Sequence, residues 1–176
     1  SQVSVSFTAP TDVGGSAITG YNVQSNNGDG QTPQIPNASY DSKSFSVASQ
    51  ETLLMAFFID DSGTRLFAVG YANDTVYQYT LSTAWDISSA SYDSKSFSVA
   101  SQMTIPRALS FSSDGTKMYV GEYTTIYEYD LSSAWDVSTA SYNSVSFSPS
   151  GQTTALHEIV LSPDGTKLYI TDVNGS

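Results

Sequence analysis

A thirteen-residue stretch occurs twice in this chain without a single change. The sequence ASYDSKSFSVASQ occupies residues 38–50 and again residues 90–102, and an altered third copy, ASYNSVSFSPSGQ, occupies residues 140–152. An internal repeat constrains the fold more than any other sequence feature, because each unit must form one supersecondary element that packs on its neighbours. The sequence therefore predicts a repeat protein.

Three markers give the same period. The glycines of three similar turns, Gly63, Gly115 and Gly165, are separated by 52 and 50 residues. Three phenylalanines, Phe45, Phe97 and Phe147, each precede one of these glycines by 18 residues and have the same spacing. Trp85 and Trp135 are again 50 residues apart. The two-residue difference lies between Gly63 and Trp85, where a length change indicates a loop.

Each unit is expected to contain four short strands. In the clearest unit these are residues 109–112, 117–122, 125–132 and 144–150, with an Asp-Gly turn after the first strand and a polar linker, SSAWDVSTASYN, before the last. In the third strand, the period of two places Tyr127, Tyr129 and Leu131 on one face and Ile126, Glu128 and Asp130 on the other. Four strands in a unit of this length are typical of a β-propeller blade.

The expected fold is thus all-β, a partial β-propeller of four-stranded antiparallel blades over residues 37–176. The count gives the last strand of one blade (43–49), two full blades and half of a third. Closed propellers have about 4 to 8 blades. We therefore expect this chain to be part of a longer polypeptide, or to assemble so that other copies supply the missing strands.

The composition agrees with strands and excludes some partners. Aromatic residues make up 12% of the chain, charged residues only 13%, and the formal net charge is -11. Nucleic acids and anionic membranes need clustered Lys and Arg, so neither is an expected partner. The chain has no Cys and no apolar run long enough for a membrane-spanning helix, and it begins without Met.

The turn motifs resemble a known family. SPDGTKLYI, SSDGTKMYV and DSGTRLFAV, followed by VYQYTLS or IYEYDLS, are similar to the strand-turn-strand signature of YVTN-type propeller repeats. In combination with STAWDISSASYDSKSFSVASQ, they resemble tandem repeats of phage and environmental bacterial proteins. This resemblance covers roughly residues 38–173 and implies a virion-surface or extracellular location without an assigned activity.

A second resemblance lies at the N-terminus. VSVSFTAPTDVGGSAITGYNVQSNNGDG, residues 3–30, is similar to the second and third strands of bacterial fibronectin type III domains. The first and later strands of that sandwich are missing. The resemblance implies an incomplete fibronectin type III-like segment over residues 1–36, completed elsewhere or paired with another chain.

The candidate ligand-binding residues are the two Trp-Asp pairs, Trp85 with Asp86 and Trp135 with Asp136. An exposed Trp stacks on sugar rings, and repeated aromatic sites would suit multivalent glycan binding. The alternative is structural: the Trp packs between strands and the Asp caps a turn, as expected from its constant place in each unit. We favour packing and keep the glycan hypothesis open.

Other candidate chemistry is weaker. Asp60, Asp61, Asp114 and Asp164 in the turns suggest calcium, but none has the alternating carboxylates of a calcium loop, so no metal or cofactor is predicted. His157, the sole histidine, aligns with Arg107 and Met55, and no nucleophile motif is present. We therefore assign no catalytic residue.

Three functional hypotheses follow. The first is a non-enzymatic structural and adhesion protein on a phage particle or bacterial surface, with other protein subunits as partners and surface glycans as a further contact. The second is a secreted carbohydrate-binding protein, and the third a polysaccharide-degrading propeller enzyme whose paired carboxylates would come from different blades. We favour the first, which rests on family analogy.

Overall fold

A computed structural model describes residues 40–173 of the chain. The chain divides into two units, and the second, Ser42–Ser176, contains all the strands discussed here. The predicted fibronectin-like segment at residues 1–36 lies outside the described residues and stays a prediction.

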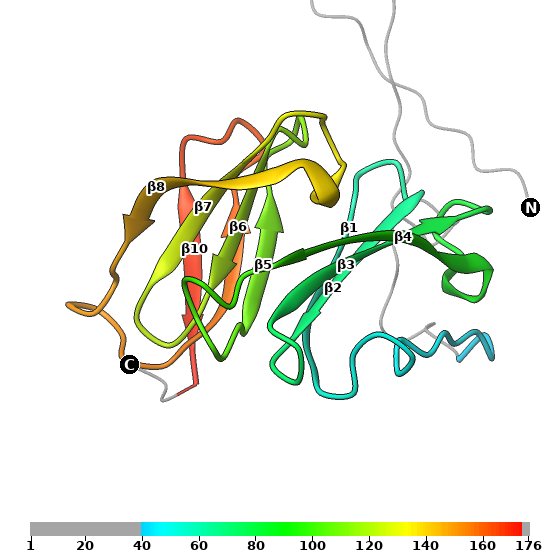
Figure 1. Cartoon of the computed structure of the whole chain (residues 1–176), viewed down its shortest axis with the longest axis horizontal. Coiled ribbons are helices and arrows are strands. Elements are labelled where there is room, and N and C mark those ends of the chain that lie inside the picture. Colours follow the sequence, from blue (N-terminus) through cyan, green and yellow to red (C-terminus); the bar gives the residue numbers. More distant parts are fainter. Residues whose placement is uncertain (1–39, 174–176) are drawn as a thin grey trace, which may run out of the picture. The chain divides into compact units, whose positions relative to one another are not determined.

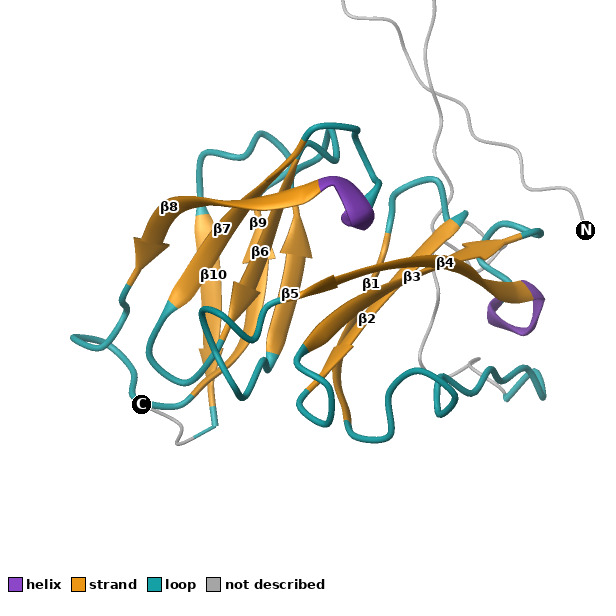
Figure 2. Cartoon of the chain, in the orientation of Figure 1, coloured by secondary structure: helices purple, strands orange, loops and turns teal. Residues whose placement is uncertain are grey.

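The described residues form an all-β structure of three antiparallel sheets (Figures 1 and 2). The strands are β1 (Leu54–Ile59), β2 (Arg65–Gly70), β3 (Thr75–Leu81), β4 (Ala90–Ser98), β5 (Ala108–Phe111), β6 (Lys117–Gly121), β7 (Ile126–Leu131), β8 (Ala140–Phe147), β9 (Leu156–Leu161) and β10 (Leu168–Asp172). Sheet 1 has the order β1-β2-β3-β4, sheet 2 the order β5-β6-β7-β8, and sheet 3 is the hairpin of β9 and β10. Each strand thus pairs with its neighbour in sequence, as the repeat predicts.

Helix is confined, among residues 40–173, to two 3-10 turns, η2 (Ile87–Ser89) and η3 (Val137–Thr139). No helix in this part of the chain has the length and apolar character of a membrane span. The described sheets do not close into a barrel or a ring. The partial propeller therefore stays a prediction, whereas the four-stranded antiparallel sheets are confirmed.

The three turn glycines have the conformation that the Asp-Gly motif predicts. Gly63, Gly115 and Gly165 have φ of 69°, 70° and 67°, a region in which a side chain is strained. In each turn the glycine N–H donates to the carbonyl three residues earlier, at 2.8 to 2.9 Å. These turns join β1 to β2, β5 to β6 and β9 to β10.

Opposite faces of sheet 2 pack on different neighbours. Tyr129 and Leu131 belong to the core shared with sheet 1, against which Tyr127 also packs. Ile126 belongs to the core shared with β9 and β10. The predicted alternation along the third strand of the unit is confirmed, and it makes sheet 2 the middle layer of three.

The linker before the fourth strand is shorter than the sequence predicts. Asp86 and Asp136 cap η2 and η3, and β4 and β8 begin directly afterwards, at Ala90 and Ala140. Both strands contain a bulge that lets the long strand follow its partner, with Ser94 and Ser144 at φ of 59° and 66°. Serines that looked like linker are therefore strand residues.

Residues 43–49, predicted as a lone fourth strand, form no strand in the structure. A strand needs a hydrogen-bonding neighbour, and no strand among the described residues pairs with this segment. The segment nevertheless keeps features of its copies. Ser42 has φ of 61°, as Ser94 does, and Phe45 packs edge-on against Tyr79 with ring centroids 5.4 Å apart. Phe97 packs on Tyr129 at the same 5.4 Å.

Candidate functional site

The aspartates of the turns are held by hydrogen bonds within the turns. Asp114 accepts from the Ser112 hydroxyl at 2.7 Å and from the Thr116 N–H at 3.0 Å, and these donors lower its pKa to about 2. Asp164 makes the equivalent bonds with Ser162 and Thr166. These carboxylates complete their own turns, and no group of three metal-ligating side chains occurs among the described residues.

The first turn has the same chemistry with its positions exchanged. Here the carboxylate stands first, as Asp60, and the hydroxyl third, as Ser62, with a hydrogen bond of 2.5 Å between them. Asp60 also accepts from the Thr64 and Arg65 N–H groups and forms a 2.9 Å ion pair with Arg65. Burial alone would raise the pKa of Asp60, but these hydrogen bonds outweigh it and the pKa is lowered.

Trp135 lies between sheets 1 and 2. Its ring stacks on Phe58 and Phe67 of sheet 1, with centroids 6.3 and 6.1 Å away, and lies 5.7 Å from Phe111 of its own sheet. The Arg65 guanidinium lies 6.0 Å from the ring centroid. Protein atoms therefore surround much of this ring, as expected of a packing residue.

Trp85 occupies the equivalent place in sheet 1, where neither of the other two described sheets covers it. Like Trp135, it has φ of 63° and donates its N–H to the carbonyl of the turn glycine, here Gly63, at 2.8 Å. A Cβ placed on Gly63 would lie 2.4 Å from the Trp85 ring, and one on Gly115 would lie 2.2 Å from the Trp135 ring. Both rings thus cover their glycines, but 63% of Trp85 stays exposed.

Asp86 and Asp136 have capping and pairing roles. Asp86 accepts from the Ser88 N–H and hydroxyl, and Asp136 from those of Ser138. Asp86 also pairs with Lys43 at 2.9 Å, and Asp136 with Lys95 of β4 at 2.7 Å. The Ser88 hydroxyl and Lys43 lower the pKa of Asp86, and Lys95 and the Ser138 hydroxyl that of Asp136.

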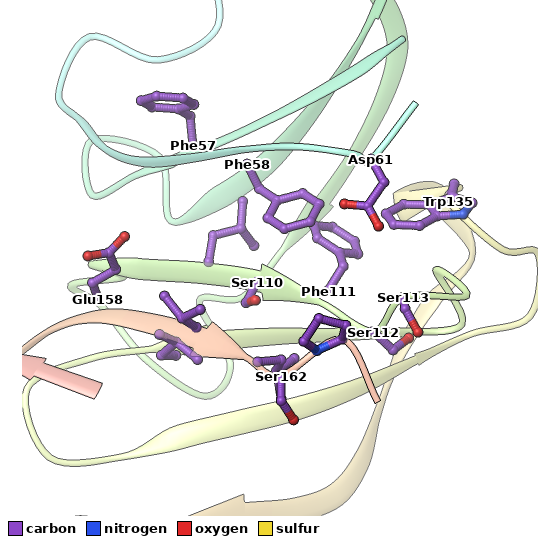
Figure 3. A pocket seen from close by; sticks show the side chains of 15 residues that line it. Phe57, Phe58, Asp61, Ser110, Phe111, Ser112, Ser113, Trp135, Glu158 and Ser162 are labelled. Carbon is purple, nitrogen blue, oxygen red and sulfur yellow. The ribbon is translucent and has the colours of Figure 1, made fainter. Parts of the chain in front are cut away.

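A cavity of about 240 Å³ lies where the first strands of the three sheets meet (Figure 3). β5 contacts both β1 and β9 there. The wall contains aromatic rings, hydroxyls and two carboxylates, including Phe58, Asp61, Ser110, Phe111, Ser113, Trp135 and Glu158. In Figure 3, Phe58 points toward Phe111, whereas Phe57 points away from both.

The cavity brings together only part of the predicted site. Trp135 lines it, whereas Trp85, Asp86 and Asp136 do not. Asp61 and Glu158 could contribute polar contacts to a small ligand, and Glu158 was not expected from the sequence. Its neighbour His157 is exposed on β9 and lines an adjoining hollow with Met55 and Arg107.

Comparison with known proteins gives a fold likeness. No family model and no curated protein matches the chain. A crystal structure titled as that of a functionally unknown protein from Desulfotomaculum acetoxidans DSM 771 is similar, with a TM-score of 0.51 and 17% sequence identity. The match covers 69% of this chain and 36% of that one. This chain therefore spans about a third of that protein, and at this identity the likeness concerns the fold alone.

Two neighbouring acidic residues, the buried Glu51 and the half-buried Asp74, have no motif that marks them in the sequence. Glu51 is almost fully buried, and one of its carboxylate oxygens lacks a hydrogen-bond partner, as does one buried oxygen of Asp74. Burial and the negative charge of Glu51 raise the pKa of Asp74. The aligned residues in the next unit are Met103 and Thr124, so this pair is particular to sheet 1.

Proposed function

We propose that this protein is a non-enzymatic structural and adhesion protein, displayed on a phage particle or a bacterial cell surface, in which a partial β-propeller serves as a rigid scaffold. The observation that carries the proposal is the junction between sheets 1 and 2. Trp135, Phe58, Phe67 and Phe111 fill it with aromatic rings, and Lys95 and Asp136 close its outer edge. Such a junction favours rigidity over catalysis.

The sheet arrangement supports the propeller part of the proposal. Each four-stranded sheet is a simple meander, and the first strands β1, β5 and β9 run next to one another. A propeller arranges four-stranded sheets of this kind around a central channel. The likeness to a solved structure, of which this chain spans about a third, is compatible with further blades.

The loops between the second and third strands would present the contact surface. Both loops have four residues, 71–74 and 122–125, but their sequences differ, and each has an exposed tyrosine, Tyr71 in one and Tyr123 in the other. The Arg107 guanidinium lies 4.3 Å from the Tyr123 ring centroid. A constant scaffold with variable loops is the usual arrangement of a binding protein.

Surface labelling tests the proposed location and role. Antibodies raised against residues 40–173 should label intact virions or unpermeabilised cells of the source, and the purified chain should compete with particle attachment. Labelling that requires lysis of the particle or cell would contradict the proposal.

Glycan binding is the second candidate, because the cavity at Trp135 combines aromatic rings with the Asp61 carboxylate and serine hydroxyls. Sugar sites use this combination of stacking surface and polar groups. Glycan-array binding that Asp61→Asn weakens would place sugars in the cavity, whereas binding lost only with Trp85→Ala would place them at the exposed ring. An array without hits would remove this candidate.

The enzyme hypothesis has its own test. Asp61 and Glu158 are the carboxylates of the cavity, and turnover of a polysaccharide panel that Glu158→Gln abolishes would establish an enzyme and overturn the non-enzymatic proposal. The Glu158→Gln variant is a suitable probe because the residue is exposed and its exchange should leave folding intact.

A further inference from the structure

The two outer faces of the three-layer stack expose residues whose repeat equivalents are buried. On the outer face of sheet 1, Phe57 is 60% exposed, whereas its equivalents Leu109 and Ile159, which face a neighbouring sheet, are 5% and 3% exposed. Trp85 on the same face is 63% exposed. This face therefore has the residues of a junction, but none of the three described sheets packs against it.

The outer face of sheet 3 resembles the face that sheet 1 contributes to its junction with sheet 2. Val160 and Tyr169 form a cross-strand pair there, as Phe58 and Phe67 do in sheet 1. Phe67 is fully buried beneath sheet 2, whereas Tyr169 is 56% and Val160 48% exposed. Lys167 stands at the position of Arg65, whose guanidinium lies over Trp135.

We propose that the outer face of sheet 3 in one copy of this chain docks onto the outer face of sheet 1 in a second copy, head to tail, reproducing the junction between sheets 1 and 2. In this contact Trp85 packs on the Val160 and Tyr169 of the other copy, as Trp135 packs on Phe58 and Phe67. Lys167 takes the place of Arg65 over the indole ring, a favourable cation–π arrangement. The inference rests on the proposed scaffold function in taking other subunits as partners.

The contacts of residues 43–49 give an independent reason to expect that a second copy of this chain docks on the outer face of sheet 1. At the internal junction the outer strand of the preceding sheet contributes Lys95 to Asp136 and Phe97 to Tyr129. At the outer face of sheet 1, Lys43 already pairs with Asp86 and Phe45 with Tyr79. Residues 43–49 thus fill the place of the preceding outer strand. No strand of residues 40–173 fills the place of the first two strands of that preceding sheet, which β9 and β10 match.

The symmetry of such a contact has a definite consequence. Two different faces meet, so the contact is heterologous and each added copy leaves one face of each kind free. The copies form a ring if the rotation closes and a growing chain if it does not. A dimer made by two identical faces would stop at two copies.

Paired variants test the proposal by sedimentation velocity on the full chain. Phe57→Glu blocks the sheet 1 face and Tyr169→Glu blocks the sheet 3 face; both residues are more than half exposed, so folding should persist, which circular dichroism checks. The unaltered chain should form dimers and larger species as its concentration rises. Each variant alone should remain monomeric, and their equimolar mixture should form a heterodimer and nothing larger.

Tyr71→Glu is the matched control, because Tyr71 is also an exposed aromatic residue but lies in the β2–β3 loop. It should associate as the unaltered chain does. An unaltered chain that remains monomeric at every soluble concentration, or a mixture of variants that fails to form the heterodimer, would overturn the proposal. Neither outcome depends on surface labelling, so the scaffold function and the head-to-tail contact stand or fall separately.

Discussion

The side-chain oxygen of Gln78 in sheet 1 accepts a hydrogen bond of 3.1 Å from the backbone N–H of Val137 in η3. The bond joins residues 59 positions apart, and both partners are buried. The amide group of Gln78 is itself held by Asp93 of β4, at 3.1 Å. A single side chain thus connects the outer strand of one sheet to the capped turn of the next.

Replacing Gln78 by Leu should lower the free energy of unfolding by about 1–3 kcal/mol, because the Val137 N–H would stay buried without an acceptor. Urea unfolding measures the change. Thr80→Val is the control: Thr80 also donates to Asp93, at 3.0 Å, but it is exposed and does not reach sheet 2. If Gln78→Leu lowers the free energy of unfolding no more than Thr80→Val does, the hydrogen bond between the two sheets does not contribute to stability.

Alanine at the three turn glycines should have graded effects. All three share positive φ, which costs about 1–2 kcal/mol with a Cβ. Gly115→Ala should cost a further 1–3 kcal/mol from overpacking, because its Cβ would collide with Trp135, which is held between sheets. A Cβ at Gly165 has no atom within 4 Å, and the nearest atoms to a Cβ at Gly63 belong to the exposed Trp85. Thermal unfolding should rank Gly115→Ala as the most destabilising. Equal losses of stability at the three sites would contradict the tight packing of Trp135 on Gly115.

The two tryptophans should differ in their effect on stability. Trp135→Ala removes a ring packed on three phenylalanines and should cost about 3–5 kcal/mol. Trp85→Ala should cost much less in the dilute monomer, since most of its side chain faces solvent. Denaturant unfolding at low protein concentration makes the comparison. Similar losses would mean that the exposed ring packs more closely than the structure indicates.

Acid should destabilise the turns in a defined pH window. The pKa of Asp114 is depressed from 3.8 to about 2, so its stabilising contribution is present above about pH 4 and lost as pH falls toward 2. Asp164 has a lowered pKa for the same reason. Asp114→Asn should lower stability above this window, where the carboxylate contributes, and should flatten the stability curve within the window.

Asp74 should behave in the opposite way. Its pKa is raised by burial and by Glu51, so it stabilises the fold below its unfolded pKa, and this contribution is lost as pH rises. Asp74→Asn should raise the free energy of unfolding by about 1 kcal/mol at neutral pH by removing a partly buried charge, and should change little at pH 3. Asn also tolerates the φ of 47° at this position. A loss of stability at neutral pH would show that the charge has a partner.

The sequence predicted the parts of the fold that depend on local rules. The Gly115 turn and the alternating faces of residues 126–131 follow from Asp-Gly chemistry and a period of two, and both are confirmed. The start of β8 was placed too late, because the serines around Tyr142 resemble a linker. Nothing local showed that Ser144 forms a bulge, which depends on pairing with β7.

The site depends on which sheets meet, which a repeat pattern does not specify. Trp85 and Trp135 have identical neighbours in sequence and the same backbone conformation, yet only Trp135 lies between two sheets. The negative charge of Glu51 acts on Asp74 of another loop of the same unit, and the repeat alignment does not indicate this because the other unit has no charge at either position. Both features come from tertiary context.

The carboxylate comes first and the hydroxyl third in one turn (Asp60 and Ser62), whereas the order is reversed in the next (Ser112 and Asp114). This reversed order affects how the units can recombine. Each turn needs one carboxylate and one hydroxyl, and either order satisfies it. A crossover between gene segments that falls inside the turn would join the first half of one order to the second half of the other, and would yield two carboxylates or two hydroxyls. Exchange between the first and second units is therefore expected to be tolerated outside this turn and selected against within it.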